Sequence, residues 1–167
     1  MTGPGAETDV VPVSAEQADV LLHRPDEFSE RFGLTLVPGF MAFPEALPHT
    51  LQALRDGVAA EWSSYLIIVR DEVVGFGGFT GPPDDEGRVE IGYCIAPARR
   101  GRGFATAAAR AWVERARAFG VRMITAHTLP AENPSTGVLR RLGFVRDGEA
   151  IDPDEGPVWR WTLRIEP

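Results

Sequence analysis

The sequence has no lysine, so all 17 of its basic residues are arginine, and it has a single cysteine, Cys94. One cysteine excludes an internal disulfide and a cysteine-based metal cluster. No apolar run approaches the roughly 18 residues that a membrane-spanning helix needs. The segment 1–13 is acidic overall and lacks the basic and apolar regions of a secretory signal. These absences predict a cytoplasmic protein with no membrane partner and no metal site.

The arginines are concentrated in one part of a chain whose net charge is -7. Between Arg88 and Arg146 there are eleven arginines and three acidic residues, whereas the rest of the chain has six arginines and 21 acidic residues. Such asymmetry is typical of an anion-binding site. Nucleic acid is one such anion, but no aromatic residues interleave with the arginines, and no known nucleic-acid-binding motif accompanies them. We therefore expect a smaller anionic ligand and no nucleic-acid partner.

Length and hydrophobic pattern predict one α/β domain in which helices and strands alternate. Ser14 and Gln17 form a capping box for a helix that ends at about Leu22, and the segment 24–50 is expected to be irregular because four prolines interrupt it. Further helices are expected over about 44–60, 103–119 and 134–142. Strands are expected over 10–13, 65–70, 73–79, 88–96, 121–129, 144–151 and 158–165.

The segment 88–129 has the order strand, loop, helix, strand. A crossover of this kind joins parallel neighbouring strands, whereas the other connections are expected to be antiparallel. Its loop reads Pro97-Ala-Arg-Arg-Gly-Arg-Gly-Phe-Ala-Thr106. Glycines before a helix N-terminus let successive backbone N–H groups converge on an anion, and the helix dipole adds partial positive charge. The loop is therefore a candidate pyrophosphate site.

Two common nucleotide-binding loops do not fit this segment. A dinucleotide fingerprint needs a third glycine where Thr106 stands, and an acidic residue at the end of the next strand, where His127 and Thr128 stand. A Walker A loop needs a lysine, which the chain lacks.

Three motifs resemble the GNAT superfamily of CoA-dependent N-acetyltransferases. Arg100-x-x-Gly103-x-Ala105 is similar to the family's Arg/Gln-x-x-Gly-x-Gly/Ala signature. The run Glu90-Ile-Gly-Tyr-Cys-Ile-Ala-Pro97 resembles the preceding strand, and Asn133 to Phe144 resembles a later helix with its Gly-Phe end. Within this superfamily, the sequence most resembles the branch that includes ribosomal-protein N-terminal acetyltransferases.

The resemblance implies a single GNAT domain over residues 1–167, with about six to seven strands in a mixed sheet, two parallel strands that splay apart, and flanking helices. Its parts would be an acceptor-side half (10–87), an acetyl-CoA-binding core (88–146) and a terminal hairpin (147–167). Acetyl-CoA is the implied co-substrate, and a monomer or homodimer is expected. The implied acetyl-CoA contacts are Tyr93, Cys94, Ile95, Arg100, Gly101, Arg102, Gly103, Phe104, Ala105, Thr106 and Asn133.

Transfer to an amine needs a base for the ammonium proton and a donor for the departing thiolate. Glu90 is the leading candidate base, because it resembles the strand glutamate of some relatives. Thr128 matches the base position of others, and His127 is a further alternative, which strand alternation places on the opposite face from Thr128. The Ile95 amide is the candidate oxyanion donor. Many relatives carry a tyrosine acid where this chain has Leu139, so Ser135 or water is expected to serve.

The resemblance implies direct transfer of an acetyl group to a primary amine, on a small molecule or a peptide N-terminus. Cys94 is interpreted as a small apolar strand residue and not as an acyl carrier. The alternative is a catalytically inactive acyl-CoA sensor or partner protein of the same fold.

Overall fold

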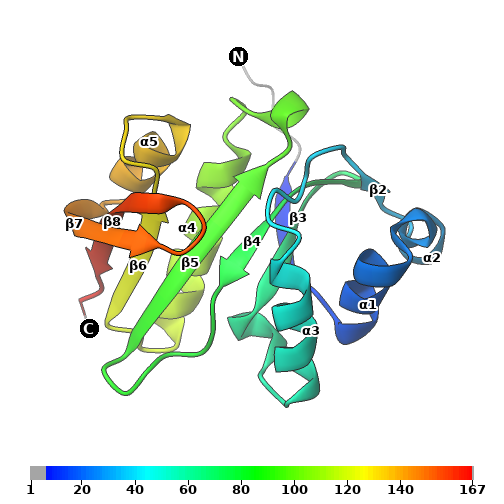
Figure 1. Cartoon of the computed structure of the whole chain (residues 1–167), viewed down its shortest axis with the longest axis horizontal. Coiled ribbons are helices and arrows are strands. Elements are labelled where there is room, and N and C mark those ends of the chain that lie inside the picture. Colours follow the sequence, from blue (N-terminus) through cyan, green and yellow to red (C-terminus); the bar gives the residue numbers. More distant parts are fainter. Residues whose placement is uncertain (1–6, 167) are drawn as a thin grey trace.

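The computed structural model describes residues 7–166, which form a mixed β-sheet with helices on both faces (Figure 1). Seven strands follow the order β1-β3-β4-β5-β6-β8-β7, and β2 pairs with β4. The predicted domain also includes residues 1–6 and 167, which lie outside the described residues. The strands are β1 (Thr8–Pro12), β2 (Thr35–Leu36), β3 (Ser64–Val69), β4 (Glu72–Phe79), β5 (Arg88–Ile95), β6 (Met123–Thr128), β7 (Val145–Asp152) and β8 (Gly156–Arg164).

The helices are α1 (Ala15–His23), α2 (Phe28–Phe32), α3 (Ala46–Arg55), α4 (Phe104–Ala118) and α5 (Pro134–Arg141). Helices α1, α4 and α5 begin and end within about one residue of their predicted positions. The Ser14 capping box of α1 is confirmed, with the Gln17 amide donating to Ser14 Oγ at 3.0 Å. None of the helices within residues 7–166 is long and apolar enough to cross a membrane.

Two expectations for the first half of the chain were wrong. The segment 24–50 contains α2, which Gly33 ends in the left-handed conformation at φ 68°, and the short strand β2. Helix α3 ends at Arg55 and not near residue 60, since Gly57 turns the chain with φ 93°. The prolines did not predict where α2 and α3 end, because a glycine with positive φ lies at or just after each end, and they did not predict β2, which depends on pairing with β4.

The predicted crossover is confirmed. Strands β5 and β6 are parallel neighbours joined through α4, and the pairs β1–β3, β3–β4, β4–β5, β6–β8 and β7–β8 are antiparallel. The short strand β2 is the exception, since it runs parallel to β4. The Thr35 amide donates to the Asp71 carbonyl at 2.8 Å, and the Val37 amide donates to the Val73 carbonyl at 3.1 Å.

The two faces of the sheet carry different layers. On one face α4 inserts Trp112, which is 1% exposed and stacks on Tyr93 of β5 with 6.3 Å between the ring centroids. On the other face lies α3, where Thr50 Oγ1 and Ser64 Oγ are 2.6 Å apart. Figure 1 shows α4 behind the sheet and α1 to α3 grouped in front at one end. Because side chains alternate along a strand, even-numbered residues of β5 lie on the α3 face.

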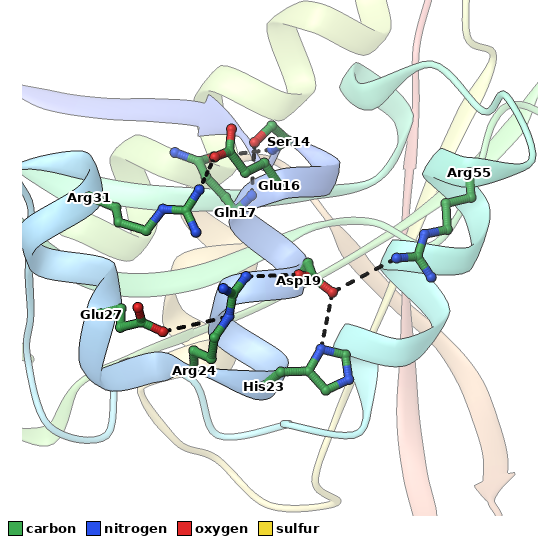
Figure 2. A network of polar contacts seen from close by, with 9 residues as sticks. All are labelled: Ser14, Glu16, Gln17, Asp19, His23, Arg24, Glu27, Arg31 and Arg55. Atoms are coloured by element: carbon green, nitrogen blue, oxygen red, sulfur yellow. Dashed lines mark hydrogen bonds and ion pairs between the residues drawn. The ribbon is translucent and has the colours of Figure 1, made fainter.

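A surface network of polar contacts joins the three N-terminal helices, as Figure 2 shows. Asp19 of α1 lies at its centre and pairs with His23 at 3.1 Å and with Arg24 at 3.2 Å. Arg55 of α3 approaches the same carboxylate at 3.8 Å. Exposed ion pairs of this kind contribute about 0–1 kcal/mol each to stability. The buried apolar residues of α1 and α3, such as Val20 and Leu51, therefore stabilise this layer more than the ion pairs do.

Candidate active site

The two parallel strands β5 and β6 diverge toward their C-terminal ends. Their register runs from Arg88↔Met123 to Ile91↔Ala126 and stops there, although β5 stays paired with β4 as far as Gly75↔Ile95. The predicted splay of the parallel strands is therefore confirmed. It opens one edge of β5 beyond Ile91.

The direction of the β5 main chain decides which backbone groups face this opening. The Ala96 amide donates to the Val74 carbonyl at 2.7 Å, and the Thr80 amide donates to the Glu90 carbonyl at 3.0 Å. Even-numbered residues therefore bond with β4. Because these directions alternate along a strand, Tyr93 and Ile95 present their N–H and C=O groups to the opening. Arg100 Nε donates to the Ile95 carbonyl at 3.1 Å, so at Ile95 it is the amide that is left facing the opening.

The loop before α4 has the shape that its glycines predict. Gly101 and Gly103 have φ values of 76° and 83°, and apart from the adjoining residues no atom of the described chain lies within 4 Å of the position that a Cβ would take on either glycine. Gly103 is the N-cap residue of α4 and provides no side-chain cap. The amide groups of the first helical turn therefore point into open space beside the loop, where an anion fits.

A cavity of about 860 Å³ lies between this loop, the open edge of β5 and the start of α5. We call it the loop cavity. Its lining also includes Phe43 and Leu129, which are 44% and 51% exposed, and Arg141 of α5. All but two of the predicted site residues line it: Tyr93, Cys94, Ile95, Arg100, Gly101, Gly103, Phe104, Ala105, Thr106, Asn133 and Ser135. The exceptions are Arg102, whose side chain is exposed, and Glu90.

Asn133 both lines the loop cavity and caps α5. Its Oδ1 accepts the Thr136 amide at 3.1 Å, and its own amide donates to Thr136 Oγ1 at 3.2 Å. The preceding Glu132 accepts from Arg140 and from Thr136 Oγ1, and the Arg140 guanidinium lowers the pKa of this carboxyl to about 2. These contacts fix the start of α5 against the cavity.

Tyr93 and Ser135 touch through their hydroxyl groups inside the loop cavity. Ser135 Oγ donates to Tyr93 Oη at 3.1 Å, and the Tyr93 hydroxyl donates to the Ser135 carbonyl at 3.4 Å. Burial raises the pKa of the Tyr93 phenol, and the hydrogen bond from Ser135 partly opposes this shift. Leu139, at the position of the relatives' tyrosine, is fully buried.

The thiol of Cys94 is held by the main chain of a neighbouring loop. Its Sγ accepts the Ala42 amide at 3.2 Å and lies 3.4 Å from the Phe40 carbonyl. Burial raises the pKa of the thiol, which lowers the fraction of reactive thiolate at neutral pH.

Glu90 lies at the junction of the loop cavity with a second cavity. Its Oε2 is 3.4 Å from Nδ1 of His127, which lines the loop cavity. Glu90 itself lines a cavity of about 520 Å³ that we call the Glu90 cavity. The two candidate bases therefore form a pair between the cavities. Thr128 is on the opposite face, as alternation predicts, and its Oγ1 accepts Trp161 Nε1 at 2.9 Å.

Two ion pairs form the walls of the Glu90 cavity. Asp84 pairs with Arg88 at 3.0 Å, and Asp147 pairs with Arg160 at 3.0 Å. The pKa of the Asp84 carboxyl is lowered by the Arg88 amide and guanidinium. The pKa of the Asp147 carboxyl is lowered by hydrogen bonds from Thr162 and Arg160. Each of these carboxylates already has a cationic partner, whereas Glu90 pairs with an imidazole.

Sequence reasoning missed three features of the site. It expected only the main chain of Tyr93 to contact acetyl-CoA and gave its side chain no role. It did not predict that His127 contacts Glu90, and it did not name Arg141 as a site residue. The signal for the His127 contact was present in the strand alternation, but the partner could be identified only from the β5–β6 register, in which Glu90 opposes Thr125.

Comparisons with known proteins agree with this fold. Residues 11–145 match the family model of the acetyltransferase (GNAT) domain. The uncharacterized N-acetyltransferase YjdG of Bacillus subtilis (strain 168) is 32% identical over 114 residues, which cover 66% of this chain and 68% of YjdG.

Solved structures share the whole architecture at low sequence identity. The RimL ribosomal L7/L12 alpha-N-protein acetyltransferase in complex with coenzyme A has a TM-score of 0.69 and 15% identity, covering 98% of this chain and 97% of RimL. The microcin C7 self-immunity acetyltransferase MccE in complex with acetyl-CoA and AMP has a TM-score of 0.68 and 14% identity, with coverage of 95% and 93%.

The mixed sheet of this chain is the fold that these acetyltransferase structures share. The chain belongs to the GNAT acetyltransferase family.

Proposed function

We propose that this protein transfers an acetyl group from acetyl-CoA directly to a primary amine, on a small molecule or a peptide N-terminus. The observation that carries the proposal is the Glu90–His127 pair, whose members line two different cavities that meet at this contact. One cavity suits an acyl donor and the other an amine.

The loop cavity suits acetyl-CoA because its backbone and charge match a pyrophosphate. Gly101 and Gly103 leave space for two phosphates beside the N-terminus of α4, and Arg100 and Arg141 add positive charge. The coenzyme A and acetyl-CoA complexes of the structural neighbours support this placement. The pantetheine arm would then follow the open edge of β5, with the Ile95 amide donating to the thioester oxygen.

Glu90 is the proposed general base. An ammonium ion in the Glu90 cavity loses a proton to the Glu90 carboxylate, and the neutral amine attacks the thioester carbon. The imidazole of His127, 3.4 Å from Glu90, orients this carboxylate at the junction of the cavities. Cys94 takes no part as an acyl carrier, since its thiol is held by main-chain groups and has a raised pKa.

A thiol-release assay with a panel of amines tests the function. The panel contains peptides with free α-amino groups, the same peptides with blocked N-termini, and small primary amines. We expect release of free CoA that depends on an unblocked amine, and acetylated product by mass spectrometry. Binding of acetyl-CoA without turnover on any amine would favour the alternative, an acyl-CoA sensor of the same fold.

A further inference from the structure

The pair of hydroxyl groups at Tyr93 and Ser135 bears on how the thiolate leaves, provided that the proposed function holds. When the tetrahedral intermediate collapses, the C–S bond breaks and its electron pair goes to sulfur, so a nearby acid assists departure. The position that supplies this acid in many relatives is Leu139, whose side chain is apolar and fully buried. The acid must therefore come from another residue or from water.

The splay of the strands indicates where the sulfur would lie. A pantetheine arm that starts at the α4 N-terminus and follows the open edge of β5 passes Ile95 first and Tyr93 second. It can go no further, because β5 and β6 are paired again at Ile91↔Ala126. The reacting end of the arm therefore lies along the stretch of β5 from Ile95, whose amide is the proposed donor to the thioester oxygen, to Tyr93.

Among the residues that the structure describes, four with hydroxyl groups line the loop cavity. Thr106 belongs to the first turn of α4, at the phosphate end. Thr128 donates its proton to the Leu129 carbonyl at 3.1 Å. Tyr93 and Ser135 remain, and they contact each other. The Tyr93 hydroxyl donates to the Ser135 carbonyl only at 3.4 Å, longer than an ordinary O–H···O bond, so this proton is the more easily released of the two.

Acidity separates these two candidates. A phenol has a reference pKa near 10, close to the value of about 8.5 for a thiol, whereas an aliphatic alcohol is a far weaker acid. Ser135 Oγ donates to Tyr93 Oη, so it stabilises the phenolate that remains after proton transfer. We infer that Tyr93 donates the proton to the CoA thiolate and that Ser135 positions and supports its hydroxyl.

The step balances without a further reactant. The proton moves from Tyr93 Oη to sulfur, which yields CoA as the free thiol, and solvent then returns a proton to the phenolate. The amine nitrogen loses two protons in all, one to Glu90 before attack and one to solvent as the intermediate collapses, and Glu90 passes its proton on to solvent. Because one proton returns to the phenolate, the net products are the amide, CoA and one proton.

Two variants of the full chain test the assignment. Tyr93→Phe keeps the ring that stacks on Trp112 and removes only the hydroxyl, whereas Ser135→Ala removes the supporting donor. We expect kcat to fall by about 10²-fold or more in Tyr93→Phe, the lower end of the usual effect of a positioned acid. We expect a loss below tenfold in Ser135→Ala, and acetyl-CoA affinity by calorimetry close to that of the wild-type protein in both.

The pH profile of kcat separates an acid from a packing residue. The wild-type rate should fall at alkaline pH as the phenol ionises, and this limb should be absent in Tyr93→Phe but retained in Ser135→Ala. A larger loss in Ser135→Ala than in Tyr93→Phe would assign the acid to Ser135 and overturn the inference. Wild-type rates in Tyr93→Phe, or a loss explained by weaker acetyl-CoA binding, would also overturn it. A wild-type protein that is inactive on every amine would contradict the proposed function and this inference with it.

Discussion

The loop cavity and the Glu90 cavity meet at one pair of side chains but are built in different ways. Much of the loop cavity is lined by one continuous segment, residues 99–106, whose glycines expose backbone amides. The Glu90 cavity is lined by side chains from separate segments, 80–90, 123–125, 147 and 160–162. A site formed by the backbone of one loop is encoded locally, whereas a site of converging side chains depends on strand register.

The largest expected effect is in the Glu90 cavity. Glu90→Gln keeps the shape of the side chain and removes the base, so kcat should fall by about 10²–10⁴, the usual contribution of general-base catalysis. Acetyl-CoA affinity should change little, because Glu90 lies outside the loop cavity. The deficit should shrink as pH rises, since more of the amine arrives already deprotonated. Steady-state rates across pH measure this.

Asp84→Asn is the matched control, because Asp84 lines the same cavity but already pairs with Arg88. We expect its rate loss to stay below about tenfold. A pH-independent loss in Glu90→Gln would indicate substrate positioning instead of proton removal, and full activity would move the base to His127 or water.

The next effect is in the loop cavity. A valine at Gly103 places a branched side chain where phosphate would bind and disfavours the left-handed φ of 83°. We expect the Kd for acetyl-CoA to rise at least tenfold, about 1.4 kcal/mol, in calorimetric titrations.

Gly33→Val controls for the backbone strain alone. Gly33 has a φ of 68°, and apart from the adjoining residues no atom of the described chain lies within 4 Å of the position that its Cβ would take. It ends α2, outside the residues that line either cavity. The variant should lose stability but keep acetyl-CoA affinity. Unchanged affinity in a folded Gly103→Val protein would refute the loop as the phosphate site.

A smaller effect concerns the Cys94 thiol, which lines the loop cavity. Burial raises the pKa of Cys94, so the thiolate population at pH 7–8 is below that of an exposed cysteine. Alkylation by iodoacetamide should be several-fold slower than for free cysteine, and mass spectrometry after incubation with acetyl-CoA should find no acetyl group on Cys94. An adduct that is then transferred to amine would replace direct transfer with a covalent route.

The smallest effect is on stability at the edge of the loop cavity. The Arg140 guanidinium lowers the pKa of Glu132 in the folded protein to about 2, below the ordinary glutamate value of 4.5. Its contribution is therefore present above about pH 4.5 and is lost as pH falls toward 2. Glu132→Gln should be slightly less stable than the wild-type protein at pH 7, and urea unfolding should show the difference vanishing by pH 2. A constant difference across this range would mean that the ion pair does not contribute.

The sequence predicted those parts of the molecule that depend on neighbouring residues in the chain. Ser14 and Gln17 determine the start of α1, and Gly101 and Gly103 determine the shape of the loop. It did not predict α2 or β2, because β2 forms through pairing with β4, about forty residues away. The Glu90–His127 contact was missed for the same physical reason, since two strands had to be aligned before their side chains could be paired.

Under the proposed function, the separation of the two cavities predicts the kinetic order of the reaction. Within residues 7–166 the loop cavity and the Glu90 cavity share no lining residue, so neither substrate has to leave before the other enters. The donor and the amine can be bound together, and the acyl group needs no intermediate position on the protein. Double-reciprocal plots at several fixed amine concentrations should then intersect, as for a ternary complex, and the parallel lines of a substituted-enzyme cycle should not be observed.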